Sequence, residues 1–368
     1  MGNAIVQSAT IQLKDQGGGV FGSVTPVLGN GITSVTGTIA DGQTLTIAGL
    51  GFGADGPSNY NFNDFSGGTD GIEATTSNTN FDEISPFWPP LFTTDSRSGS
   101  LASRFFRQKN GGDLAYAASI QTVNLGAVTE VFKSFAVKVP AGKYFPGAGG
   151  GNAGTNADYS TSSSWKMDWL LGPDSATNDL ITATHIGHGQ WVSGGNDLGN
   201  LEALGADPTW WKWNAWNRMT QWAKAGAIPQ TNAGNLYTQI ANGVDAITEF
   251  SSTPVIFATG QAPYVWNDYH INGWSNSDGS NNANVELIYD DCYIAWGDNS
   301  AARVELGNAA TYTACTDLAI CETSNANWSN GTLTTTAREG GLNLAANTWL
   351  FVTLPDNVTR YSYQVVTV

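Results

Sequence analysis

The sequence has 368 residues, of which only 12% are charged, and its net charge at pH 7 is −16. A nucleic-acid groove or an anionic membrane surface is bound through clustered Lys and Arg, so the 15 basic residues argue against both partners. The length suits two domains, and the wealth of Gly, Ser, Thr and Asn favours short β-strands and turns over long helices.

Residues 1–30 are predicted to be an N-terminal arm that attaches to other virion subunits or to copies of the chain, with a flexible end as the alternative. The segment lacks a basic start and a long apolar run, so no classical signal peptide is predicted. We therefore expect an extracellular or virion-surface location that is reached by another route, such as lysis.

Residues 32–53 contain two alternating strands, 32–39 and 44–48, followed by a Gly-rich corner. This pattern resembles the start of an Ig-like IPT/TIG domain. Its closing strands are expected near the C-terminus, at 328–336, 349–354 and 361–368. We therefore predict a discontinuous domain of residues 31–58 plus 300–368, with residues 59–299 inserted at the corner. The alternative is two consecutive β-domains followed by a tail.

The middle region contains repeated strand signals separated by long polar loops, which is typical of a two-sheet sandwich or jelly roll. The expected strands are 130–139, 165–171, 210–222, 244–250, 254–257 and 285–296. The segment 209–226 includes five Trp residues and fits a strand better than a helix. Its face with Trp216 and Trp222 either stacks sugar rings or packs in a core.

Three segments carry a further resemblance: Tyr289–Ile294, Ala302–Gly307 and Ala314–Thr316. With the strand order before them, they resemble a concanavalin A-like jelly roll of the laminin-G/glucanase type, paired with a TIG-like module as in bacterial and phage proteins. The resemblance implies an all-β fold, in which a jelly-roll sandwich is inserted into or lies next to a small Ig-like β-sandwich. It also implies glycan contact, but it does not imply one chemistry.

Candidate catalytic residues for a polysaccharide lyase are present, although the alternating carboxylates of jelly-roll glucanases are missing. A lyase needs a base, an acid and a group that neutralises a uronate carboxylate. The candidates are His185, His188, Arg104 and Tyr293. The alternative is that both His residues are ordinary loop residues.

Candidate ligand-binding residues are aromatic side chains in polar company, which is how proteins hold sugars. They are Trp266, Tyr269, His270, Trp274 and Trp216. The alternative is that these rings cover the edge of the sandwich.

Calcium is the one cofactor considered, with Asp290, Asp291 and Asp298 as candidate ligands, and strand-end charges as the alternative. Cys315 and Cys321 are close enough in sequence to form a disulfide that leaves Cys292 as a thiol, but three thiols are also consistent with the sequence.

The sequence thus favours a non-catalytic surface or virion protein, such as a phage decoration, fibre or tail component, whose jelly roll contacts a glycan. The alternatives are a polysaccharide lyase and a purely structural assembly protein.

Overall fold

The computed structural model describes residues 11–14, 20–24, 31–84, 89–106, 121–141, 167–171, 180–184, 190–194, 212–225, 234–255, 265–271, 286–343 and 348–365. Within these ranges the chain forms antiparallel strands, turns and two short 3₁₀ segments, η3 (Tyr312–Ala314) and η4 (Asn325–Asn327). The predicted all-β class is confirmed. The same ranges contain no helix that is long and apolar enough to cross a bilayer.

The largest sheet has eight strands in the order β16–β15–β14–β10–β18–β8–β7, with β5 also paired to β18. Its strands are β5 (Asn59–Asn63), β7 (Leu91–Thr93), β8 (Ala102–Phe106), β10 (Glu130–Lys138), β14 (Asn217–Lys224), β15 (Gly234–Ala241), β16 (Thr248–Val255) and β18 (Glu286–Trp296). Strand β18 is long enough to pair with β10 on one side and with both β8 and β5 on the other.

A second sheet has six strands in the order β13–β12–β11–β17–β9–β6. These are β6 (Glu83–Ile84), β9 (Gln121–Val128), β11 (Asp168–Leu171), β12 (Leu180–Thr184), β13 (Gln190–Gly194) and β17 (Trp266–Ile271). Phe135 and Met219 of the large sheet share one core with Leu170 and Trp266 of this sheet. The two sheets therefore form a jelly-roll sandwich with alternating strand faces.

The Trp-rich stretch forms a strand only from Asn217 onward, because residues 212–216 make a turn in which Asn214 is left-handed (φ 54°). From there the predicted alternation holds. Met219 faces the sandwich core, while Trp222 faces the opposite side. Trp222 is 7% exposed and its Nε1 donates a hydrogen bond to Glu130 at 3.1 Å. For Trp222 the core interpretation is therefore the right one.

The two ends of the chain meet in the remaining sheets. Their strands are β3 (Gly31–Thr36), β4 (Thr44–Leu50), β19 (Arg303–Gly307), β20 (Leu318–Cys321), β21 (Thr332–Thr336), β22 (Thr348–Thr353) and β23 (Arg360–Val365). The sheet orders are β21–β4–β3 and β20–β19–β22–β23. Leu45 and Ile47 share a core with Leu333 and Leu350. This arrangement supports the expected discontinuous domain, but the three-part division and the likeness to an IPT/TIG module stay predictions.

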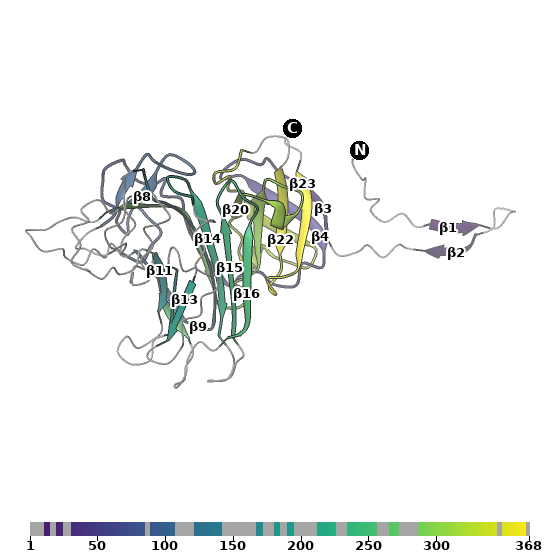
Figure 1. Ribbon diagram of the computed structural model, residues 1–368. Helices are drawn as coiled ribbons and strands as arrows, with labels where there is room; N and C mark the ends of the chain where they lie inside the picture. The colour runs from purple at the N-terminus through teal and green to yellow at the C-terminus, as the bar shows by residue number, and fades with distance from the viewer. Residues whose placement is uncertain are drawn as a thin grey trace, which may run out of the picture.

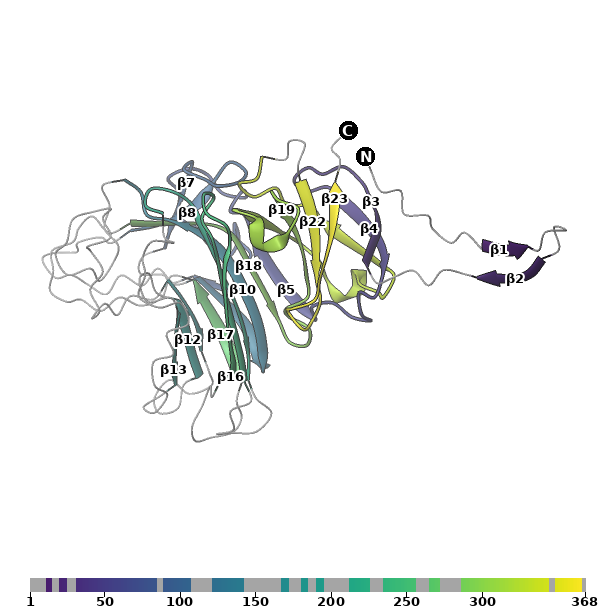
Figure 2. The same ribbon diagram turned by 45° about the vertical axis from the view of Figure 1, so that its right-hand side comes forward.

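The four-stranded sheet lies against the face of the large sheet that is turned away from the six-stranded sheet (Figures 1 and 2). Phe132 and Tyr293 of the large sheet pack against Ala301 and Ile320 there. A second cluster joins Ala241 and Ile247 to Tyr312 and Phe351. The large sheet is therefore the middle of three layers, with cores on both of its faces.

The strands β1 (Ile11–Lys14) and β2 (Val20–Val24) pair with each other in a two-stranded sheet, which Figure 1 shows apart from the three layers. A lone two-stranded hairpin is at best marginally stable in water. The attachment role of this arm stays a prediction.

Candidate functional site

Three of the predicted site residues belong to hydrophobic cores. Trp266 is 0% exposed, and Tyr269 and Tyr293 are each 1% exposed. Trp266 and Tyr269 point from β17 into the sandwich, and Tyr293 points from β18 into the contact with the C-terminal sheet. None of the three reaches solvent, so their predicted roles as sugar ligands or as a catalytic base are wrong. The alternation of each strand places these rings inward.

The other candidates are not brought together. Arg104 is half-exposed, and its Nε lies 3.7 Å from a carboxylate oxygen of Glu286, a diagonal neighbour on the adjacent strand β18. Trp216 is half-buried, with Lys138 Nζ 5.9 Å from its ring centre. His185, His188 and Trp274 lie outside the described residues. The predicted lyase group therefore has no shared location within the described part of the chain.

Asp290 and Asp291 fix a distant turn rather than a metal ion. Asp290 Oδ2 accepts hydrogen bonds from the backbone N–H groups of Arg97 and Ser98, at 2.7 and 3.0 Å. Asp291 pairs with the Arg97 guanidinium at 2.5 Å. Asp298 is exposed and uses its backbone carbonyl to hold Ser58. Among the described residues no group of three His, Cys, Asp or Glu side chains is placed to hold a metal, so this calcium prediction is corrected.

The predicted disulfide between Cys315 and Cys321 is not formed. Both residues are buried free thiols, as is Cys292. Cys321 lies in the core shared by both chain ends, whereas Cys315 lies in the separate cluster around Tyr312 and Phe351. Their side chains therefore pack in different cores, despite the short sequence separation.

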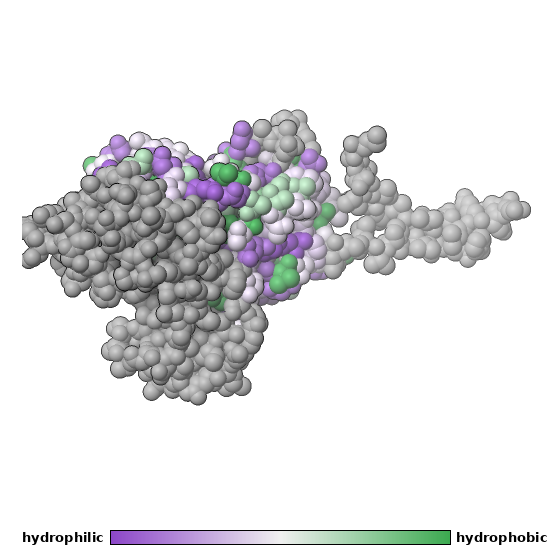
Figure 3. Space-filling model, in the orientation of Figure 1, coloured by the Kyte–Doolittle hydropathy of each residue, from purple (hydrophilic) through white to green (hydrophobic). Residues whose placement is uncertain are grey.

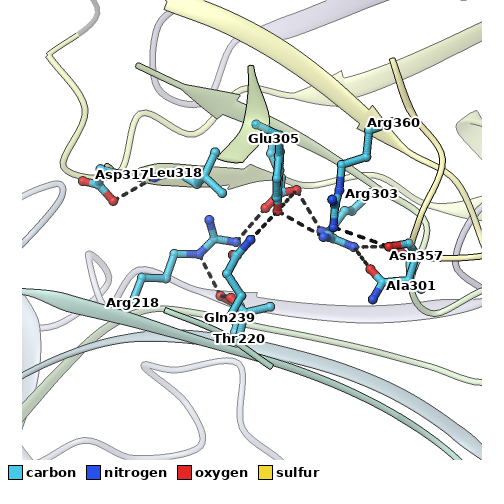
Figure 4. A network of polar contacts seen from close by, with 12 residues as sticks. Arg218, Thr220, Gln239, Ala301, Arg303, Glu305, Asp317, Leu318, Asn357 and Arg360 are labelled. Atoms are coloured by element: carbon cyan, nitrogen blue, oxygen red, sulfur yellow. Dashed lines mark hydrogen bonds and ion pairs between the residues drawn. The ribbon is translucent and has the colours of Figure 1, made fainter. Parts of the chain in front are cut away.

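A buried polar network joins the large sheet to the C-terminal sheet (Figure 4). The carboxylate of Glu305 on β19 accepts hydrogen bonds from Arg218 Nη2 at 3.0 Å, from Arg303 Nε at 2.9 Å and from the Tyr312 hydroxyl at 2.8 Å. Gln239 on β15 donates to the Tyr312 oxygen at 2.8 Å. Glu305 and Arg303 are 0% exposed and Arg218 is 3% exposed. The network is sealed from solvent.

The charges in this network set its protonation. Burial alone would raise the pKa of Glu305, but the adjacent Arg303 and Arg218 outweigh it, so the pKa of this carboxyl lies below its ordinary value. Glu305 is therefore ionised at neutral pH and is the shared anionic partner of two guanidinium groups. The hydrogen bonds of this network are made within the protein, so its role is structural. It lies between the large sheet and the C-terminal sheet, and this face of the large sheet is therefore not open to ligands.

The accessible polar face is the outer side of the six-stranded sheet. There β17 carries Asp268 and His270 between core residues, and both are half-buried. In register, Asp268 is opposite Asn124 of β9, and His270 is opposite Thr122. Aligned residues of antiparallel neighbours share a sheet face. Asp268, His270 and the exposed Asn124 therefore form one polar patch, which we call the β17 face, whereas Thr122 is buried below it at 6% exposure.

Electrostatics on the β17 face favour a neutral imidazole and raise the pKa of one carboxyl. Burial lowers the pKa of His270 from 6.5 to about 4. Burial and the nearby Glu83 raise the pKa of Asp268 above its ordinary value. Glu83 belongs to β6 at the edge of the same sheet, beside Thr122. The face thus offers a neutral ring, an amide and carboxyl groups.

The register extends the row that includes His270 across the sheet. Trp169 of β11 is opposite His270, Ala183 of β12 is opposite Trp169, and Trp191 of β13 is opposite Ala183. Two aromatic residue types thus occupy backbone positions in line with the imidazole. Sequence reasoning found His270 but missed Asp268 and Asn124. The bulge between Trp266 and Asp268 interrupts the alternation that would have shown them together.

No protein-family model and no curated protein matches this chain. Solved structures match the fold at low identity. An alginate lyase of type PL-14 from Aplysia kurodai is 9% identical, with a TM-score of 0.41, over 65% of this chain and 99% of that one. An alginate lyase from Chlorella virus is 12% identical, with a TM-score of 0.37, over 59% of this chain and 92% of that one. The basic winged bean lectin is 8% identical, with a TM-score of 0.32, over 68% of this chain and 97% of that one. These TM-scores assign neither a family nor an activity to this chain.

Proposed function

We propose that this chain is a non-catalytic surface or virion protein that binds a glycan on the β17 face. The observation that carries the proposal is the register that sets Asp268 opposite the exposed Asn124, beside the half-buried His270, on one sheet face. Amide, carboxyl and imidazole groups provide the hydrogen bonds that orient sugar hydroxyls. The Trp169 and Trp191 positions in the same row are of the residue type that stacks on sugar rings.

Charge narrows the expected ligand to a sugar without carboxylates. Asp82, Glu83 and Asp268 gather at the edge formed by β6, β9 and β17, where Asp82 Oδ2 accepts the Asn124 N–H at 2.8 Å. A uronate brought to these carboxylates would be repelled. A neutral hexose or an amino sugar meets no such penalty, so we propose one of these as the ligand.

The exposed hydrophobic residues on the rest of the described surface favour glycan binding over the docking of an apolar protein surface. Its most exposed large hydrophobic residues are Val358, Val244, Ile72 and Leu50, which are far apart in sequence. In the view of Figure 3, the coloured surface shows hydrophobic residues as small groups among hydrophilic ones. This proposal includes a phage or virion setting and an extracellular location. It also includes subunit contacts through the N-terminal arm, which the self-paired β1–β2 hairpin supports.

Binding to immobilised neutral, amino-sugar and acidic polysaccharides tests the proposal. We expect the parent to bind a neutral or amino-sugar polymer and His270→Ala and Asp268→Asn to lose at least about tenfold in affinity, the value of one or two hydrogen bonds. Asp55→Asn changes an exposed carboxylate in the loop between β4 and β5 and is the matched control, which should bind like the parent. Equal binding by all variants, or none by the parent, would contradict the proposal.

The lyase alternative has one observation in its favour, since the lowered pKa of His270 leaves its imidazole neutral and able to accept a proton at neutral pH. An increase in absorbance at the unsaturated-uronate band, lost in His270→Ala, would establish it. Because carboxylates gather near this residue, we expect no such signal with acidic polysaccharides.

A further inference from the structure

The interior of the sandwich contains one close Lys–Asp pair that bridges its two sheets. Lys133 lies on β10 of the eight-stranded sheet and Asp168 begins β11 of the six-stranded sheet. Lys133 Nζ is 2.6 Å from Asp168 Oδ2, and the two side chains are 1% and 0% exposed. The pair thus places a charged contact between two sheets whose shared core consists mainly of apolar side chains in the described residues.

The surroundings of the pair are those of a hydrophobic core. Val131 and Phe135, on the same face of β10 as Lys133, belong to the sandwich core. Tyr269 lies with its ring centre 5.8 Å from Lys133 Nζ. An ion pair at such a place usually contributes no more stability than apolar residues of the same volume. The retention of an amine and a carboxyl in contact there therefore calls for another reason.

Burial converts this pair into reactive partners. The apolar interior lowers the pKa of Lys133 despite the attraction of Asp168, and this favours the neutral amine over the ammonium ion. A proton that leaves the ammonium for the carboxylate yields an amine next to a carboxylic acid. Groups held in contact react with effective concentrations far above those in solution. Burial and then the charge of Asp168 raise the pKa of the nearby Tyr269 phenol, which therefore stays protonated at neutral pH.

We propose that Lys133 and Asp168 condense to an intramolecular amide that covalently joins the two sheets of the sandwich. The Nζ lone pair attacks Cγ of the protonated carboxyl and forms the N–C bond. The C–OH bond then breaks, and the hydroxyl leaves with a proton from the nitrogen as one water molecule. The step involves no oxidation or reduction and no co-reactant.

The mass of the intact, denatured full-length chain tests this proposal directly. We expect the parent to be lighter than its sequence mass by one water molecule. Proteolytic mapping should then yield a branched peptide that contains Lys133 and Asp168. A parent with its full sequence mass would overturn the proposal, as would a water loss mapped to another pair of residues.

Variants make the assignment specific. Lys133→Met removes the nucleophile and should have its full sequence mass. Asp168→Asn offers a carboxamide instead, so the same attack should release one ammonia molecule rather than water. Lys224→Met is the matched control, because Lys224 pairs with Glu130 at 2.7 Å but is 46% exposed. It should keep the loss of one water. A deficit that persists in Lys133→Met, or disappears in Lys224→Met, would overturn the proposal.

Discussion

Arg218 of the large sheet donates a hydrogen bond from Nη2 to Glu305 of the C-terminal sheet at 3.0 Å, and both side chains are sealed from solvent. The contact lies between segments that are far apart in sequence and belong to different sheets. Arg303 and Tyr312 donate hydrogen bonds to the same carboxylate. Glu305 therefore connects the polar groups of two layers at their interface.

Replacing Glu305 by Gln should therefore destabilise the fold strongly. The change leaves the guanidinium groups of Arg218 and Arg303 buried without their anion, and breaking such a pair costs about 3–5 kcal/mol in the free energy of unfolding. Urea denaturation followed by Trp fluorescence measures the loss. Asp245→Asn breaks the exposed pair with Lys212 and serves as the control, with little change expected. A Glu305→Gln variant as stable as this control would contradict the structural role.

The stability of the folded chain should fall in mild acid partly because of His270. Burial lowers its pKa from 6.5 to about 4, so between these values the unfolded chain binds a proton that the folded chain does not. Stability therefore decreases as the pH drops through this window. We expect the decline between neutral pH and about pH 4 to be smaller by about 1–3 kcal/mol in His270→Gln, allowing for the partial exposure of the ring.

Denaturant titrations of the parent and the variant across this pH range provide the measurement. Val244→Ala changes an exposed, non-titrating side chain and should keep the pH dependence of the parent. If His270→Gln also kept it, the imidazole would not be the group responsible.

Gly307 should not tolerate a side chain. A Cβ at this position would lie 2.7 Å from Cys315 Sγ and 2.9 Å from Phe351 Cε2. Overpacking of this kind costs about 1–3 kcal/mol, so Gly307→Ala should lower the melting temperature measurably. At Gly331 the nearest atom to a new Cβ is the Gly49 carbonyl oxygen at 3.6 Å, an ordinary contact. Gly331→Ala is therefore the matched control, and equal melting temperatures for the two variants would contradict the packing.

All three cysteines should titrate as thiols, and only after unfolding. Burial raises the pKa of Cys315 to about 11 and that of Cys321 to about 12, which leaves little reactive thiolate at neutral pH. A colorimetric thiol reagent should detect three groups in denaturant without reductant and almost none in the native protein. A count of one in denaturant would restore the disulfide that the sequence had predicted.

Strands with apolar alternation on at least one face could be predicted from the sequence, and a strand with buried polar residues on both faces could not. Val131, Phe135 and Val137 alternate in the predicted segment 130–139, and they point into the sandwich core as expected. Strand β15 was not predicted, because Thr238 and Gln239 make it read as polar. In the structure both residues are 0% exposed. Thr238 lies on the face of β15 that enters the sandwich core with Leu236 and Ile240, whereas Gln239 is covered from the C-terminal side and donates a hydrogen bond to Tyr312. Burial by a distant segment cannot be read from local periodicity.

The candidate site shows the same limit. Asp290 and Asp291 have the composition of a cation site, but their partners are Arg97 and Ser98, almost two hundred residues earlier in the chain. Conversely, Asp268 and Asn124 gain their meaning only from the register of β17 with β9. Composition indicated polar residues with aromatic neighbours, whereas pairing between strands decides which of them share a face.

The pairing of β4 with β21 has a consequence for how the chain is made. Strand β4 leaves the ribosome early, but its partner emerges only after nearly the whole sandwich has been synthesised. During that interval the edge of β4 is open, and the apolar side chains of Leu45 and Ile47 lack their later cover. Nascent chains that stall before β21 would present this edge to one another, and exposed strand edges invite aggregation. The late strand β21 thus decides whether the edge of β4 is covered, and a cell that produces this protein would benefit from a chaperone bound to β3 and β4 until β21 has been synthesised.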